Sequence, residues 1–230
     1  MNRKDQIQQF INENKQEELL QIINKITNEA KDRRKSKIIC EEGIHEIIIR
    51  NIPYFIEQEK EKEITECLYQ LIKRPTLITY FSVELTNIII ENEVYQWNFD
   101  ILRSITRDQQ HGKELHQYLP QIINQFKNVD FFTNQYACYS LSNLAKWYSN
   151  EFYDLFIHIV DKMCVCNVNE ISEEHWLAVG EALCMICQHI DDKIKLAGKI
   201  DYKLVELRDN NKEKICLCNI IRDIIQFLAK

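Results

Sequence analysis

The sequence predicts an all-α protein made of repeated helical units, and three observations lead to this fold class. Only four glycines and three prolines occur in 230 residues, too few for the turns of a β-sandwich or a doubly wound sheet. Apolar residues recur at spacings of three and four along most of the chain, as they do on one face of a helix. Matching apolar frames return roughly every 40 residues, centred on Lys25, Gln70, Ser104, Asn143, Met185 and Asn219.

The N-terminal part is predicted to be a polar tail or cap helix over residues 1–15, followed by a repeat domain over residues 16–230. The first helix of that domain begins near Gln16, where an apolar stripe appears at helical spacing. Gly43 is expected to end a short helix in the left-handed conformation that glycine adopts most easily. A second apolar helix then runs to Pro53, which is expected to end it.

The middle of the chain is predicted as a series of helices separated by prolines and polar runs. The expected helices are Glu57–Lys73, Leu77–Ile90, Val94–Arg107 and a segment from Leu115 to Phe126. Asp108–Gly112 is predicted as a polar loop. Pro120 suits the start of the last of these helices, because a first-turn residue needs no N–H partner.

The C-terminal half carries the clearest helical patterns. Gln135–Trp147, Phe152–Met163, Trp176–His189 and Ile215–Leu228 are each predicted as one amphipathic helix. Ile194–Leu207 is predicted as two pieces, a short helix and an apolar helix with Gly198 between them.

The helix Gln135–Trp147 also carries a resemblance to a known family. It reads Gln-Tyr-Ala-Cys-Tyr-Ser-Leu-Ser-Asn-Leu-Ala-Lys-Trp. The stretch resembles the third helix of an armadillo repeat, usually written Ala-x-Trp-Ala-Leu-Ser-Asn-Leu-Ala, with Tyr139 at the tryptophan position. Ile38–Ile49 resembles the junction Ile-x-x-x-Gly-Ile-x-x-Ile of the same repeat. The resemblance implies a right-handed α-solenoid of about five to six armadillo-like repeats.

Within this family the chain looks most like importin alpha, whose third helices line a concave groove for extended basic peptides. The likeness implies a non-enzymatic scaffold or adaptor with a protein or extended-peptide partner, basic in character. Asn143 would hydrogen-bond the peptide backbone, and Tyr139 would supply a flat apolar wall. The candidate partner-binding residues are Tyr139, Asn143, Ser104, Asp100, Glu181 and Glu66.

Two readings of the acidic candidates stay open. Glu66, Asp100 and Glu181 stand at the tryptophan positions of their repeats and would make the groove acidic. Alternatively, they are ordinary solvated carboxylates. Two alternative functions also stay open: an importin-alpha-like adaptor for nuclear-localisation peptides, and a structural subunit of a larger assembly.

Net charge and targeting signals restrict the class of partner and the cellular compartment that the sequence predicts. The net charge is −6, and a mildly acidic body disfavours nucleic acid as a partner. No apolar run approaches the roughly 20 residues that cross a bilayer, and residues 1–6 resemble no secretory signal. Nine cysteines without a leader are expected to be reduced thiols. We therefore expect a cytoplasmic or nuclear protein.

Enzymatic chemistry has little support in the sequence. Cys184-x-x-Cys187-x-His189 is the sharpest metal-like spacing, but it falls inside a predicted helix, where small-residue packing explains the thiols. No phosphate-binding glycine loop and no His-Glu-x-x-His motif occurs. The basic run Lys31–Lys37 is interpreted as a solvated segment. We predict no catalytic residue, no cofactor and no metal.

Overall fold

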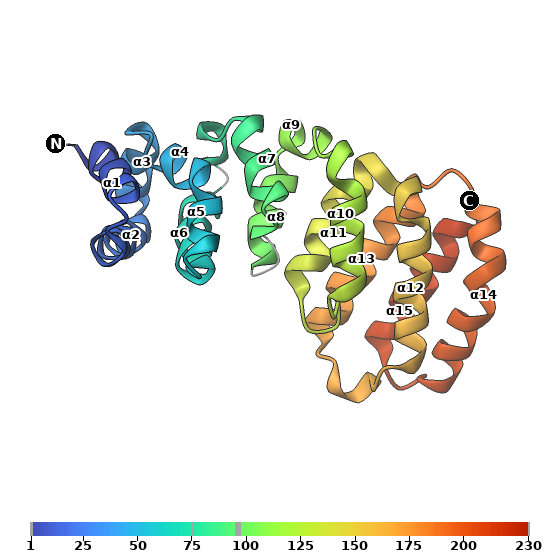
Figure 1. Cartoon of the computed structure of the whole chain (residues 1–230). Helices are drawn as coiled ribbons and strands as arrows, with labels where there is room; N and C mark the ends of the chain where they lie inside the picture. The colour runs from blue at the N-terminus through green and yellow to red at the C-terminus, as the bar shows by residue number, and fades with distance from the viewer. Residues whose placement is uncertain (1, 75, 95–97, 230) are drawn as a thin grey trace. The chain divides into compact units, whose positions relative to one another are not determined.

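The computed structural model describes residues 2–74, 76–94 and 98–229, and within them it contains helices and no strand (Figure 1). The chain divides into two compact units, Met1–Glu114 and Leu115–Lys230. Each unit is a stack of helices around its own apolar core. Among the described residues, no helix is long and apolar enough to cross a membrane.

Unit 1 consists mostly of short helices. These are α1 (Arg3–Asn12), α2 (Gln16–Ala30), α3 (Arg33–Glu41), α4 (Ile44–Arg50), α5 (Ile52–Glu57), α6 (Glu61–Ile72), η1 (Ile78–Tyr80), α7 (Val83–Glu91), α8 (Phe99–Arg107) and α9 (Gln109–Lys113). Helix α2 packs against α6, and α6 packs against α8. The first helix, α1, contacts α2 and α4 and buries Ile7 completely.

Several predicted boundaries in unit 1 were wrong. The helix expected over Glu57–Lys73 is broken, because α5 ends at Glu57 and Glu59 takes a positive φ of 56° before α6 begins. Pro53 lies in the first turn of α5 rather than ending a helix. The segment Leu77–Ile90 is split by Ser82, whose side chain accepts a hydrogen bond from the backbone N–H of Leu85 and starts α7.

The predicted helix Val94–Arg107 and the loop after it also differ from the structure. Helix α8 begins at Phe99 behind an Asn98 cap, and the part of the prediction that covers residues 95–97 lies outside the described residues. The loop predicted over Asp108–Gly112 forms the short helix α9, capped by Asp108. Gly43 has a φ of 69°, so the left-handed stop predicted there is confirmed.

Two buried histidines hold the junction between η1 and α7 in unit 1. Nε2 of His45 donates a hydrogen bond to the carbonyl of Tyr80 at 2.9 Å, and Nε2 of His111 donates to that of Phe81 at 2.8 Å. Nδ1 of His111 lies 2.8 Å from a carboxylate oxygen of Asp108. Burial alone would raise the pKa of Asp108, but hydrogen bonds from His111 and Gln110 hold it below its ordinary value. These side chains supply partners for carbonyls that no helix ladder satisfies.

Unit 2 consists of longer helices in two layers. They are η3 (His116–Tyr118), α10 (Leu119–Asn128), α11 (Gln135–Tyr148), η4 (Ser149–Phe152), α12 (Tyr153–Val165), η5 (Val168–Glu170), α13 (Glu173–His189), α14 (Lys193–Asn210) and α15 (Ile215–Leu228). One layer stacks α11, α13 and α15, and the other stacks α10, α12 and α14 (Figure 1). The predicted break at Gly198 is absent, because α14 runs through it as one helix.

Candidate functional site

The site begins with α11, whose buried side consists of small and medium-sized residues. Asn134 caps the helix by accepting a hydrogen bond from the N–H of Ala137 at 3.1 Å. The predicted inward positions are fully buried: Ala137, Cys138, Leu141, Leu144 and Ala145. Small side chains let α13 pack closely against α11. The inward face predicted for this helix is therefore confirmed.

Tyr139 and Asn143 lie on a different side of α11 from this buried stripe. They are four residues apart, so they share one face of the helix. Both side chains are half-buried and neither belongs to the core. One turn further, Trp147 is exposed. The face of α11 outside the core thus carries an amide between two aromatic rings.

Helix α13 presents the next row beside α11. Leu177, Glu181 and Met185 follow one another at four-residue spacing, so they share a face. Leu177 is 54% exposed, Glu181 is exposed and Met185 is half-buried. The hydroxyl of Ser142 on α11 donates a hydrogen bond to the Glu181 carboxylate at 3.3 Å. This bond places the carboxylate beside α11.

Helix α15 supplies the third row, and a glycine brings it close to α13. A Cβ built on Gly180 would lie only 2.7 Å from Cγ1 of Ile220, so the two helices approach at a point that leaves no room for a side chain. On α15, Ile215 is 72% exposed and Asn219, four residues later, is exposed as well. We use the term ladder face for the set Tyr139, Asn143, Leu177, Glu181, Ile215 and Asn219.

The three candidate residues in unit 1 have separate surroundings. Glu66 on α6 is exposed and accepts a hydrogen bond from Gln70 at 2.6 Å. Ser104 on α8 is half-buried. Asp100 departs from the expectation of an open acidic residue, because it is only 3% exposed and forms an ion pair with Arg103. Its charge is compensated within α8, and it offers no free carboxylate to a partner.

Sequence reasoning did not single out Leu177 as a site residue. It lies four positions before Glu181, so the same-face rule that joined Tyr139 to Asn143 would have found it. Sequence reasoning did not single out Ile215 either. The side chain of Ile215 is exposed because it lies in the first turn of α15, the helix that packs beside α13.

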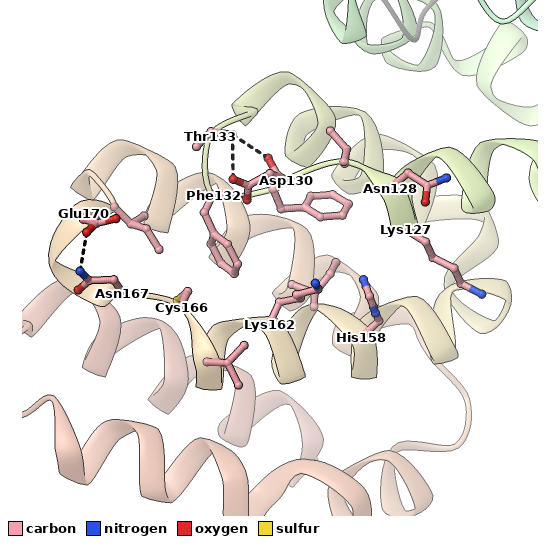
Figure 2. A pocket seen from close by; sticks show the side chains of 15 residues that line it. Lys127, Asn128, Asp130, Phe132, Thr133, His158, Lys162, Cys166, Asn167 and Glu170 are labelled. Atoms are coloured by element: carbon pink, nitrogen blue, oxygen red, sulfur yellow. Dashed lines mark hydrogen bonds between the residues drawn. The ribbon is translucent and has the colours of Figure 1, made fainter.

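A cavity of about 480 Å³ lies in the other layer of unit 2, between the α10–α11 loop and α12 (Figure 2). His158 and Lys162 lie on its α12 side. Two carboxylates of the lining are held in local turns. Asp130 in the α10–α11 loop accepts from Thr133 Oγ1 at 3.1 Å, and Glu170 at the end of η5 accepts from Asn167 at 2.7 Å. Cations and carboxylates therefore line this cavity together, and its charge selects no single class of ligand.

Four of the nine cysteines are buried and act as small core residues: Cys40, Cys67, Cys138 and Cys187. Cys138 and Cys187 are completely buried, and burial raises the pKa of the Cys138 thiol to about 12. Burial also raises the pKa of Cys184 to about 12. Protonated thiols are poor nucleophiles and poor metal ligands. Among the described residues, no three His, Cys, Asp or Glu side chains are grouped so that they could hold a metal ion.

No protein-family model matches the chain, and no curated protein sequence matches it. Solved structures do match. A designed armadillo repeat protein in complex with the peptide (KR)4 has a TM-score of 0.70 and 15% identity, covering 99% of this chain and 100% of the other. An engineered protein from the Northeast Structural Genomics Consortium has a TM-score of 0.70 and 13% identity, covering 100% of this chain and 97% of the other. The fold is therefore an α-solenoid of armadillo type, and the predicted fold class is confirmed.

Proposed function

We propose that this protein is a non-enzymatic scaffold that binds an extended peptide segment of another protein through the ladder face of unit 2. The observation that carries the proposal is the repetition of side chains outside the core, half-buried on α11 and exposed on α13 and α15, on helices packed side by side. Tyr139 and Asn143 on α11 share one helix face, and Ile215 and Asn219 on α15 share another, in each case at four-residue spacing.

The chemistry of the ladder face suits an extended backbone. An extended chain leaves its N–H and C=O groups unpaired at regular intervals, and a carboxamide donates to one and accepts from the other. Asn143 and Asn219 supply such groups on two of the three helices. Leu177 and Ile215 supply apolar surface for the peptide side chains, and Tyr139 adds a flat wall. Binding is reversible, and no covalent bond changes.

A basic peptide fits this surface better than an acidic one. Glu181 is exposed in the middle of the ladder face, and a fixed carboxylate attracts Lys and Arg side chains. The designed armadillo repeat protein with the same fold was solved with the basic peptide (KR)4. Adaptor function of the importin-alpha type, with a basic nuclear-localisation segment as cargo, is the finer form of this proposal.

A direct binding titration tests the proposal. Labelled (KR)4 and an acidic peptide of equal length, (DE)4, are titrated with the purified chain by fluorescence anisotropy. Replacing both Tyr139 and Asn143 by alanine is expected to weaken (KR)4 binding about thirtyfold, because each of the two removed contacts contributes on the order of 1 kcal/mol. Raising the salt concentration is expected to weaken binding further.

The matched control is Tyr202→Ala with Asn169→Ala. These residues have the same chemistry and are exposed on unit 2 outside the ladder face. Affinity of the control variant should equal that of the wild type. Equal losses of affinity in both double variants, or no binding of either peptide to the wild type at 100 µM, would show that the ladder face is not a peptide site.

A second candidate function is that of a subunit in a larger assembly, which the surface of α14 favours. Ile194 is 87% exposed and Tyr202 is 64% exposed, and Val205 is exposed on the same helix. Large apolar side chains on an open helix are typical of protein contacts. In sedimentation experiments, Ile194→Ser with Tyr202→Ser should abolish self-association or co-sedimentation with a partner. A wild type that stays monomeric and partner-free in extract would contradict this candidate.

A further inference from the structure

The basic run Lys31–Lys37 plays no part in the ladder face, yet unit 1 gives it a defined structure. Helix α3 begins at Arg33, and the carboxylate of Asp32 caps it by accepting from the N–H groups of Arg34 at 2.9 Å and Lys35 at 3.0 Å. Asp32 is the one acid among residues 31–37. Its oxygen is turned to the helix backbone, so it does not pair with the side chains of the five bases around it.

Three of these cations line a cavity of about 560 Å³. Arg33, Arg34 and Lys37 come from α3, and Thr76, Thr79 and Tyr80 come from the segment that includes η1. Among the described residues, the lining contains guanidinium, ammonium and hydroxyl groups and the side chain of Leu77, and no carboxylate. This volume lies in the range of about 300–1,000 Å³ that is usual for ligand sites.

The positive charge in this region is only partly compensated. Lys37 lies 3.4 Å from Glu41, and the hydroxyl of Tyr80 donates to the same carboxylate at 3.3 Å. Within the described part of the chain, no carboxylate forms an ion pair with Arg33 or Arg34. Two guanidinium groups are therefore open to a ligand, in a chain whose net charge is −6.

Arg74 keeps this surface in place and adds a further cation behind it. Its guanidinium donates to the carbonyls of Ala30 at 2.8 Å and Lys31 at 2.6 Å, and to the hydroxyl of Ser36 at 2.8 Å. These bonds tie the end of α2 to the start of α3. The partners of Arg74 are neutral, so its charge still contributes to the local positive potential.

We propose that this cavity binds an acidic segment of a protein partner, through a phosphate group or clustered carboxylates. Planar guanidinium groups match both anions with two parallel hydrogen bonds. The Thr76 hydroxyl offers a further donor, whereas that of Thr79 donates to the Thr76 carbonyl at 3.3 Å, and the N-terminus of the nine-residue α3 adds partial positive charge. A nucleic acid would gain little here, because Tyr80 is the one aromatic side chain among the described residues of the lining. The site is separate from the ladder face and opposite in charge preference.

The test uses the full chain and two labelled octapeptides of four Glu and four Ser, one of them with its serines phosphorylated. Arg33→Glu with Arg34→Glu is compared with Lys31→Glu plus Lys35→Glu. Both pairs change the net charge equally in the same segment, but the side chains of the second pair do not line the cavity. Glutamates in the first turn favour the helix dipole, so the cavity variant should keep its fold, checked by circular dichroism.

The cavity variant is expected to bind at least one peptide about tenfold more weakly, and the control variant less than about threefold more weakly. Tighter binding of the phosphorylated peptide would identify phosphate as the ligand group, and equal binding would identify carboxylates. Tyr139→Ala with Asn143→Ala should leave this binding unchanged, so the two proposals fail independently.

Three results would overturn the proposal. The first is no binding of either peptide at 100 µM. The second is an equal loss in both charge variants, which would mean diffuse attraction rather than a site. The third is binding of RNA or anionic vesicles that depends on Arg33 and Arg34 while both peptides fail, which would assign the cavity to another class of partner.

Discussion

The two units have the same helical class but are stabilised differently. In unit 1, short helices meet at junctions closed by polar side chains, with His45 and His111 bound to backbone carbonyls and Arg74 bound to the end of α2. In unit 2, long helices pack through small residues such as Ala137, and through Gly180 where α13 approaches α15. A break in a helix exposes backbone groups that need partners, while a continuous helix needs only a close neighbour.

This difference predicts which substitutions and which changes of pH each unit tolerates. The stability of unit 2 should depend on side-chain volume at its helix contacts, and these contacts should not make it depend on pH. Unit 1 should be sensitive to the loss of a few donors and to the protonation of a buried histidine. Three substitutions separate these expectations, and hydrogen–deuterium exchange assigns each effect to its unit, because separate units can unfold separately.

The largest effect is expected from Gly180→Val in unit 2. A Cβ at this position already falls within 3.0 Å of three Ile220 atoms, and valine adds two methyl groups. We expect the free energy of unfolding to fall by about 3 kcal/mol. Protection from exchange should drop in α13 and α15 and stay unchanged in α6.

Gly198→Ala is the matched control for that prediction. It lies within α14 with no atom within 4 Å of a built Cβ. Alanine there should raise the stability of unit 2 by about 1 kcal/mol through helix propensity. If both glycine substitutions change stability in the same direction, close approach is not what Gly180 provides.

A smaller effect is expected from Arg74→Met in unit 1. Methionine keeps the aliphatic stem but removes the donors to Ala30, Lys31 and Ser36, so unit 1 should lose about 2 kcal/mol in chemical unfolding. Arg50→Met removes an exposed ion pair with Glu84 and should leave the stability of unit 1 nearly unchanged. Similar losses in the two variants would mean that the junction of α2 and α3 does not depend on these bonds.

The smallest effect is a pH dependence at His45. Burial lowers the pKa of His45 below its ordinary value, although the hydrogen bond to Tyr80 opposes this. As the pH falls, His45 in the unfolded chain therefore binds a proton at a higher pH than His45 in the folded chain does. The stability of unit 1 is complete above about pH 6.5 and declines as the pH falls below it toward the lower pKa of the folded state. His45→Gln should flatten this decline, and His189→Gln on the surface should not. A decline identical in all three proteins would contradict the assignment.

The elements predicted best from the sequence are those whose pattern is local. Helix α15 begins and ends where predicted, and the inward stripe of α11 is buried as expected. The short helix α9 was missed because the sequence around His111 looks like a polar loop. The burial of His111 depends on its hydrogen bond to the carbonyl of Phe81, 30 residues away in the chain. Hydrophobic periodicity cannot reveal a contact of this kind.

The candidate site residues also divide into those that the local pattern predicts and those that depend on distant contacts. The register of Tyr139 and Asn143 on one face of α11 follows from helical spacing alone, and their half-exposed state agrees with it. Asp100 could not be judged in this way: its ion pair with Arg103 follows from helical spacing, but its burial depends on the packing of α8 against the rest of unit 1, including α6. Whether a charge at a given helical position is open or compensated depends on its neighbours in space.

The sequence by itself determined the fold class, the stacking of long helices and the left-handed turn at Gly43. These follow from apolar periodicity and from the backbone freedom of glycine, both of which act over a few residues. Only the tertiary structure decided which side chains remain exposed on adjacent helices, where the histidines find carbonyls, and that Arg33 and Arg34 face a cavity whose described lining has no carboxylate. Those outcomes depend on contacts between residues far apart in the chain, since burial and charge are properties of the packed neighbourhood rather than of the local pattern.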